Sequence, residues 1–295
     1  MSLVVALVLG IVQGVFMFVP VSSTSHLVLT QTLLRDRGVD LPPPDSPELI
    51  LFDLVVHVGT LVSVLIVMGD GIRELTGGVR DDLASGRLRQ GGLAEAVSTR
   101  LVLLGLLSVA VTGVLGLTFQ AQLSRVFGSP PAVAFALIVT GGLLWWTDLM
   151  TSGRSGRRLR FAWRGPAQVT VTVAVLIGVA QAAALTPGLS RSGTTIFAAL
   201  ILGMTRTLAA RYSFYVAIPT ILAATGVQAL QVALAEGFGG ISWAAMGVGL
   251  VSAAAVGTVA LWLVLRVLEA ARFRVFSFYV WALAAVTLAT GLGVE

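Results

Sequence analysis

Two polar segments interrupt an otherwise apolar sequence: Pro20-Val21-Ser22-Ser23-Thr24-Ser25-His26 and Pro187-Gly188-Leu189-Ser190-Arg191-Ser192-Gly193-Thr194-Thr195. One lies near the start of each half of the chain. Hydrocarbon tolerates irregular backbone and ionisable side chains only where they are buried in protein or line a wet cavity. Each segment therefore marks a candidate site, and their matching positions predict one composite site at the interface of two repeats.

The composition indicates an integral membrane protein. Hydrophobic residues make up 56% of the chain and charged residues 11%, compared with about 25% charged residues in soluble domains. We expect one membrane domain over residues 1–295, with halves of about 1–150 and 151–295. The chain has no cysteine, which excludes disulfides, thiol catalysis and cysteine-ligated metals. The net charge of +5 is read as a topology signal on loops, so no nucleic-acid partner is expected.

Short apolar stretches follow both polar segments, at Leu27–Leu34 and Ile196–Leu202. They are too short to cross about 30 Å of hydrocarbon. Each polar segment is therefore expected at the tip of a re-entrant helical hairpin. The fold class is then an all-α polytopic membrane protein with two such hairpins and six transmembrane helices, at Leu49–Met68, Leu101–Phe119, Ala132–Leu149, Tyr212–Leu234, Trp243–Val267 and Val275–Leu292.

The arginines support this topology. All 19 basic residues are arginines, and with re-entrant hairpins fifteen loop arginines fall on one face, while Arg35, Arg37 and Arg125 fall on the other. The positive-inside rule makes the arginine-rich face cytoplasmic. The two hairpins then enter from opposite sides, which is an inverted repeat. The stretches Asp70–Thr99 and Ser152–Arg164 are interpreted as cytoplasmic linkers.

A short sequence echo supports the repeat. Gly10-Ile11-Val12-Gln13 precedes the first polar segment as Gly178-Val179-Ala180-Gln181 precedes the second. Each segment is also followed by a short apolar piece and then by a span that begins near a phenylalanine.

Arg191 is the strongest single signal for chemistry. Its guanidinium fork, the hydroxyls of neighbouring residues, and backbone freedom at two glycines together suit a phosphate oxyanion at a helix start. The alternative is a purely structural pairing of Arg191 with Asp53 or with a hairpin carbonyl. The neighbouring candidates for binding are Gly188, Ser190, Ser192, Gly193 and Thr194.

The first segment offers a hydroxyl and an imidazole on one helical face. Ser23 and His26 are three residues apart, a spacing that suits a nucleophile with a proton partner. Ser22 and Thr24 are further binding candidates. The alternative is structural, because hydroxyls in membrane helices commonly bond to carbonyls or pack between helices.

Asp53 and His57 lie four residues apart within an expected span. Ionisable residues in a membrane usually face the protein interior. This pair is a candidate to bind substrate, to hold a divalent ion through Asp53, or to tune a proton relay. A structural hydrogen bond between them is the alternative.

These stretches, together with Ala209-Ala210-Arg211-Tyr212-Ser213-Phe214 through Ile218-Pro219, resemble the undecaprenyl-diphosphate phosphatase family, membrane phosphatases associated with bacitracin resistance. The resemblance spans essentially the whole chain. It implies hydrolysis of a polyprenyl diphosphate to the monophosphate carrier of envelope glycan synthesis, in the plasma (inner) membrane. It places Ser23 and His26 as nucleophile or acid/base pair and Arg191 as the diphosphate clamp.

The resemblance also implies partners and a cofactor. The partners are the polyprenyl diphosphate and membrane lipids, a homodimer is left open, and the candidate cofactor is magnesium or calcium. The family's first motif resembles E/Q-x-x-x-E, and here those positions are Gln13 and Met17. A thioether is a poor ligand for hard cations and carries no titratable proton. Asp53 is one substitute for the carboxylate; otherwise the chain is slow, metal-independent, or a flippase or small-anion transporter that uses the same site without hydrolysis.

Overall fold

The computed structural model describes residues 1–43, 46–90, 92–119, 122, 130–151, 165–235, 241–269 and 273–290. The Ser152–Arg164 stretch therefore lies outside the described residues. The elements in the described ranges are helices. They are α1 (Leu3–Phe18), α2 (Ser23–Asp36), α3 (Pro47–Val67), α4 (Gly69–Ala84), α5 (Arg87–Gln90), η1 (Gly92–Ala94), α6 (Val97–Thr118), α8 (Pro130–Thr151), η2 (Pro166–Gln168), α9 (Val171–Ala183), α10 (Arg191–Ile201), α11 (Arg206–Ala235), α12 (Trp243–Glu269) and α13 (Arg274–Thr290).

Within the described ranges, five helices are long and apolar enough to cross a membrane: α3, α6, α8, α11 and α12. Three further apolar helices, α1, α9 and α13, are shorter. The sixth expected span corresponds to α13, which has 17 residues. The prediction of an all-helical, multi-pass membrane protein is confirmed.

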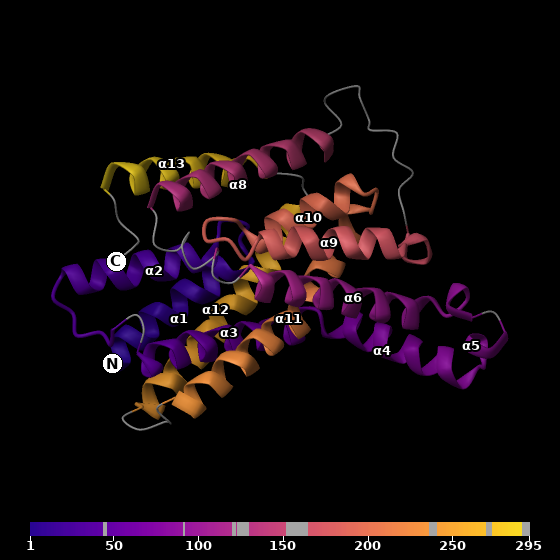
Figure 1. Cartoon of the computed structure of the whole chain (residues 1–295), viewed down its shortest axis with the longest axis horizontal. Helices are drawn as coiled ribbons and strands as arrows, with labels where there is room; N and C mark the ends of the chain where they lie inside the picture. The colour runs from indigo at the N-terminus through magenta and orange to yellow at the C-terminus, as the bar shows by residue number, and fades with distance from the viewer. Residues whose placement is uncertain are drawn as a thin grey trace.

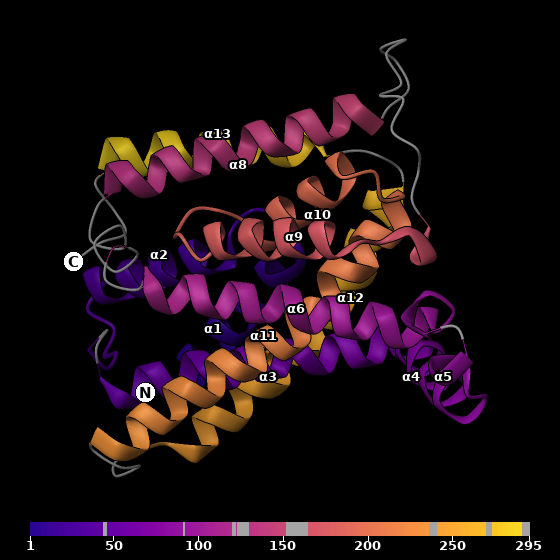
Figure 2. The ribbon, with the colours of Figure 1, turned by 45° about the vertical axis from the view of Figure 1, so that its right-hand side comes forward.

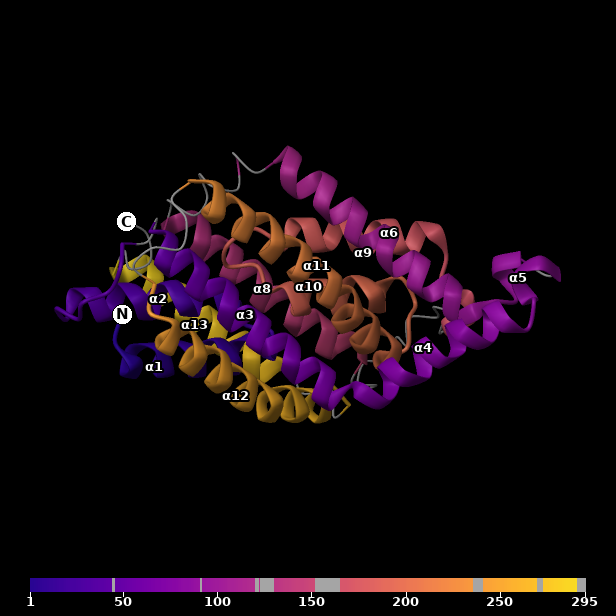
Figure 3. The same cartoon turned by 90° about the horizontal axis from the view of Figure 1, so that it is seen from below.

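Two helical pairs fold back on themselves and open toward opposite ends of the molecule (Figures 1 and 3). Helix α2 returns beside α1 toward the end where α1 begins, and α10 returns beside α9 toward the end that carries α4 and α5. Both turns lie in the middle of the molecule. The start of α1 and the end of α13 lie at the same end (Figure 2).

The packing partners of the two halves correspond. Helix α1 packs on α12, and its counterpart α9 packs on α6. Helices α3 and α11 contact each other, as do α8 and α13, which run side by side (Figure 2). The echoed glycines explain these contacts, since a Cβ at Gly10 would collide with Gly249 and Ser252 of α12, and one at Gly178 with Ser108 and Val111 of α6. Small residues permit such close helix approach in membranes.

The linker expected at Asp70–Thr99 is largely helical, which corrects that prediction. Residues 69–84 form α4, in which Ile72, Leu75 and Val79 recur at helical spacing, and α4 packs against α6. This amphipathic pattern buries one face and outweighs the helix-weakening pair Gly77-Gly78.

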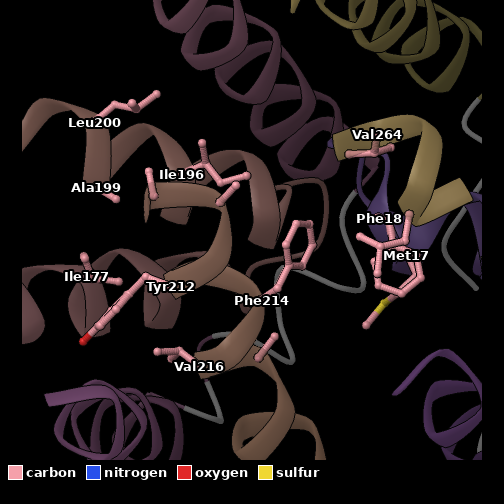
Figure 4. Close-up of a cluster of buried hydrophobic side chains, with 14 of the residues drawn as sticks. Met17, Phe18, Ile177, Ile196, Ala199, Leu200, Tyr212, Phe214, Val216 and Val264 are labelled. Atoms are coloured by element: carbon pink, nitrogen blue, oxygen red, sulfur yellow. The ribbon is translucent and has the colours of Figure 1, made fainter. Parts of the chain in front are cut away.

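The two turns share one hydrophobic core. Met17 and Phe18, at the end of α1, belong to the same buried cluster as Ile196 and Leu200 of α10. Figure 4 shows Phe214 of α11 pointing toward Phe18, and their rings meet edge to face with centroids 6.0 Å apart. Apolar packing therefore fixes the two turns relative to one another.

Candidate active site at two helix starts

The second polar segment is held in place by α8. Ser190 caps α10 by accepting a hydrogen bond from the Gly193 backbone N–H at 3.2 Å, and its own N–H donates to Thr140 Oγ1 at 3.1 Å. The Thr140 hydroxyl donates to the Gly188 carbonyl at 2.9 Å. Gly188 has φ +91°, and a Cβ there would collide with Val133 of α8. Only glycine fits this turn without strain.

Arg191 is the first residue of α10, and its side chain is partly buried. Within the described ranges its guanidinium makes no hydrogen bond or ion pair, while it lies within electrostatic range of His57. The structural alternative of pairing with Asp53 or a hairpin carbonyl is therefore absent from this structure. An unpaired guanidinium at a helix start is an anion-binding arrangement.

The other hydroxyls of this segment lie in the interior. Ser192 and Thr194 are both buried. Ser192 Oγ lies 3.5 Å from Ser190 Oγ, and Thr194 Oγ1 has no hydrogen-bond partner in the described part of the chain. A buried hydroxyl without a hydrogen-bond partner lowers the stability of the fold unless a ligand or a water molecule bonds to it.

The first polar segment opens α2. Ser22 adopts φ +68°, and its hydroxyl pairs with that of Ser25 at 3.1 Å. The Ser23 hydroxyl donates to the sulfur of Met17 at 3.7 Å. The Thr24 side chain is exposed, whereas those of Ser22 and Ser25 are buried. Thr24 therefore faces away from the other hydroxyls of the segment.

His26 is buried and bonded at both ring nitrogens. Its Nδ1 lies 2.7 Å from the Ser22 carbonyl oxygen, and its Nε2 lies 2.7 Å from the Tyr279 hydroxyl on α13. The structure does not pair His26 with Ser23 by a hydrogen bond. The roles of these two residues remain predictions.

Gln13 is fully buried on α1. Its amide donates to the Met17 sulfur at 3.4 Å, and its Oε1 has no partner among the described residues. Met17 therefore sits between Gln13 and Ser23, which places the position of the altered motif directly against the candidate nucleophile.

Asp53 and His57 lie on α3. The Gln31 amide of α2 donates to Asp53 Oδ1 at 3.0 Å. His57 Nδ1 donates to the backbone carbonyl of Asp53 at 2.6 Å, so the two side chains do not bond to each other. Both are partly buried, and their roles in binding stay predictions.

The described residues do not form a complete divalent-cation site by themselves. No three histidine, aspartate or glutamate side chains in the described ranges come together in a way that could hold a metal ion. Position 17 offers only a thioether, and Asp53 is already bonded to Gln31. A hard cation needs several oxygen ligands. We therefore derive no catalytic step through a metal.

Helices α2 and α10 both begin near the middle of the molecule and run toward opposite ends (Figure 1). Each helix start carries unpaired backbone N–H groups and the positive end of a helix dipole. With Arg191 these groups make an arrangement that can bind a multiply charged anion and stabilise further negative charge. No hydrogen bond joins the two polar segments directly in the described part of the chain.

Sequence reasoning missed three partners of the site: Gln31, Thr140 and Tyr279. The signal for Tyr279 is its phenol within an apolar span, because a tyrosine hydroxyl within a membrane helix usually finds a hydrogen-bond partner; the residue is 43% exposed. Which partner it finds depends on how α13 packs, and no local pattern gives that packing.

An apolar groove of about 480 Å³ opens between α4, α6 and α11. Its walls include Leu101, Gly105, Tyr212 and Pro219, with Glu74 and Arg211 among the polar residues. The groove lies one helix away from the second polar segment, since Ser213, next to Tyr212, hydrogen-bonds Thr195 of α10.

The sequence of this chain is similar to known proteins over nearly its whole length. A family model described as "Bacitracin resistance protein BacA" matches residues 6–286. The undecaprenyl-diphosphatase of Halorhodospira halophila is 50% identical over 98% of this chain and 97% of its own length. That of Alkalilimnicola ehrlichii is 49% identical over 99% and 97%. Undecaprenyl-diphosphatase 2 of Stutzerimonas stutzeri is 36% identical over the full length of both chains.

Proposed function

We infer, since this chain belongs to the bacitracin resistance protein BacA family, that it hydrolyses undecaprenyl diphosphate to the monophosphate and inorganic phosphate. The reaction recycles the lipid carrier of envelope glycan synthesis. The structural observation that best supports diphosphate binding is the unpaired guanidinium of Arg191 at the start of a helix inside a membrane protein. A flippase or transporter is not favoured, because the relatives compared above are named for diphosphate hydrolysis.

We propose that Arg191 and the N–H groups that begin α2 and α10 neutralise the diphosphate. The Ser23 oxygen, or a water, attacks the terminal phosphorus in line with the bridging oxygen. The bond from phosphorus to that oxygen breaks, and undecaprenyl monophosphate leaves. If Ser23 attacks, water then releases phosphate from the serine. His26 accepts and returns the proton. The buried hydroxyls of Ser190, Ser192 and Thr194, with Gln13, Ser22, Asp53 and His57, bind and orient the substrate.

The proposed topology has six spans and two re-entrant hairpins that enter from opposite faces, in the inner membrane. The corresponding packing of α1 on α12 and of α9 on α6 supports an inverted repeat. The arginine count makes the face with α4 and α5 cytoplasmic. All groups in the mechanism come from one chain, so it does not require a homodimer.

The groove between α4, α6 and α11 is proposed to take part of the isoprenoid tail. It is apolar along most of its length, and apolar walls suit a polyprenyl chain. The rest of the tail lies in the bilayer. A phosphatase whose substrate is anchored by such a tail needs its site within membrane helices.

Phosphate release by purified protein in detergent tests the proposal. We expect release from undecaprenyl diphosphate that depends on Arg191 and Ser23. A protein that keeps its thermal unfolding transition and releases no phosphate above the blank would refute hydrolysis, and uptake of the intact lipid into vesicles would then favour the transporter. Residual turnover in Ser23→Ala would identify water as the nucleophile.

A further inference from the structure

The His26 ring is held on three sides. Besides the Ser22 carbonyl and the Tyr279 hydroxyl, Phe16 of α1 stacks on its face with ring centroids 3.8 Å apart and planes inclined by 17°. The His26 and Tyr279 rings are nearly parallel, at 11°, with centroids 5.6 Å apart. The groups that contact the ring in the described part of the chain therefore come from α1, α2 and α13, and none of the three is charged.

The two bonds fix where protons sit on His26. A carbonyl oxygen can only accept, so Nδ1 must carry a hydrogen and donate it to Ser22. In the neutral ring Nε2 is then bare and accepts the Tyr279 O–H. In the charged ring Nε2–H donates to the Tyr279 oxygen instead. Proton exchange is therefore confined to Nε2, the edge that faces Tyr279: the Tyr279 O–H turns away as Nε2 takes up a proton, and the new Nε2–H then donates to the Tyr279 oxygen.

The backbone conformation of Ser22 also helps to fix the position of His26. Ser22 is the one described residue other than glycine with positive φ. Its carbonyl accepts both the side-chain Nδ1–H and, at 3.4 Å, the backbone N–H of His26. The positive φ of Ser22 is a strained conformation for a residue other than glycine, and such strain is found where a site requires a particular backbone position. Here it accompanies a Ser22 carbonyl that faces the His26 ring.

We propose that Tyr279 is a positioning residue of the phosphatase, whose phenol fixes the orientation of His26 and keeps Nε2 as the edge that exchanges the catalytic proton. This inference rests on the proposed function. It assigns a role to α13 in the chemistry, although no residue of that helix was a candidate from the sequence.

Nitrogen NMR tests the arrangement without any assay of activity. The chain has two histidines, so ¹⁵N-histidine labelling gives two imidazoles, and His57→Gln assigns them. In the neutral wild type we expect a protonated Nδ1 and a hydrogen-bonded, unprotonated Nε2 for His26. In Tyr279→Phe the Nε2 resonance should move toward that of a free nitrogen, while Ser277→Ala on the same helix should not move it. A neutral His26 protonated at Nε2 would overturn the proposal, even in a protein that hydrolyses the lipid.

Kinetics test the role. Loss of one hydrogen bond should lower kcat of Tyr279→Phe by about 2- to 10-fold, with KM unchanged, while Ser277→Ala keeps wild-type turnover. Ser277 is a suitable control because its buried hydroxyl has no partner among the described residues. In a His26→Ala background Tyr279→Phe should have no further effect. Unchanged kcat in Tyr279→Phe, or an equal loss in the His26→Ala background, would contradict a role through His26.

Discussion

The hydroxyl of Ser23 donates a hydrogen bond to the sulfur of Met17, at 3.7 Å. Position 17 is where the chain departs from its family's motif, and Ser23 is the proposed nucleophile. A thioether accepts such a bond weakly and cannot take the proton. The contact shows that a side chain at position 17 reaches the Ser23 hydroxyl. A substitution at position 17 can therefore act directly on the proposed nucleophile.

Replacing Arg191 with lysine should lower kcat/KM by about 100-fold. An ammonium keeps the charge but loses the planar fork that matches a phosphate edge. Arg80→Lys is the matched control, because Arg80 is exposed on α4. Steady-state phosphate release measures both variants. Near-normal kcat/KM in Arg191→Lys would contradict the proposal that the Arg191 guanidinium binds the diphosphate through two hydrogen bonds.

Much of the fold was predictable because apolar length and arginine placement are local features. The helical pairs that fold back at the two polar segments and the close-packed counterpart positions Gly10 and Gly178 could be predicted in this way. The helix α4 was not predicted within the expected linker, where the pair Gly77-Gly78 weakens the helical pattern. The bond between His26 and Tyr279 joins residues 253 positions apart. Such contacts follow from helix packing, which the sequence does not encode locally.

Cysteine labelling tests the proposed topology in this cysteine-free chain. Gln168→Cys and Thr205→Cys flank the second helical pair and should react with an impermeant reagent only from the cytoplasmic side. Asp40→Cys, in an exposed position after α2, should react only from outside. Labelling of the first two positions from outside alone would contradict six spans.

The contact between α4 and α6 should weaken in acid. The backbone N–H of Thr99 donates to Asp82 Oδ2 at 3.0 Å and Arg87 donates to Oδ1 at 3.2 Å, and these bonds hold the pKa of Asp82 below its ordinary value. Stabilisation by a lowered pKa is complete above the unfolded pKa and is lost as pH falls through the folded pKa. Hydrogen exchange in α4 should therefore rise below about pH 4. Asp82→Asn should remove this dependence, and exposed Asp81→Asn should keep it.

Filling the groove should discriminate between tails. A Cβ at Gly105 would contact Val216 at 3.6 Å, so Gly105→Leu can fold while its larger side chain occupies the groove. We expect KM for undecaprenyl diphosphate to rise about tenfold and KM for farnesyl diphosphate to stay the same. Gly113→Leu, on the same helix with open space around it, is the control. An equal rise in KM for undecaprenyl diphosphate and for farnesyl diphosphate would mean that the long isoprenoid tail does not occupy this groove.

Restoring a carboxylate at position 17 should raise turnover. Met17→Glu would bring an acceptor of protons against the Ser23 hydroxyl, where general-base assistance is worth about 100-fold or more in favourable geometry. A gain that appears only with magnesium or calcium would instead indicate that the carboxylate completes a cation site together with Asp53.

The competing expectation is that Met17 only packs between helices, since it is buried, and that a charge there weakens the fold. Turnover and thermal unfolding should therefore be measured together, with and without each ion. Met17→Gln is the matched control, because it keeps the length of glutamate but can neither accept a proton at neutral pH nor hold a cation by charge. A folded Met17→Glu protein that shows no gain over Met17→Gln under any ion condition would mean that the missing carboxylate does not limit this enzyme. Asp53 would then be the carboxylate to vary next.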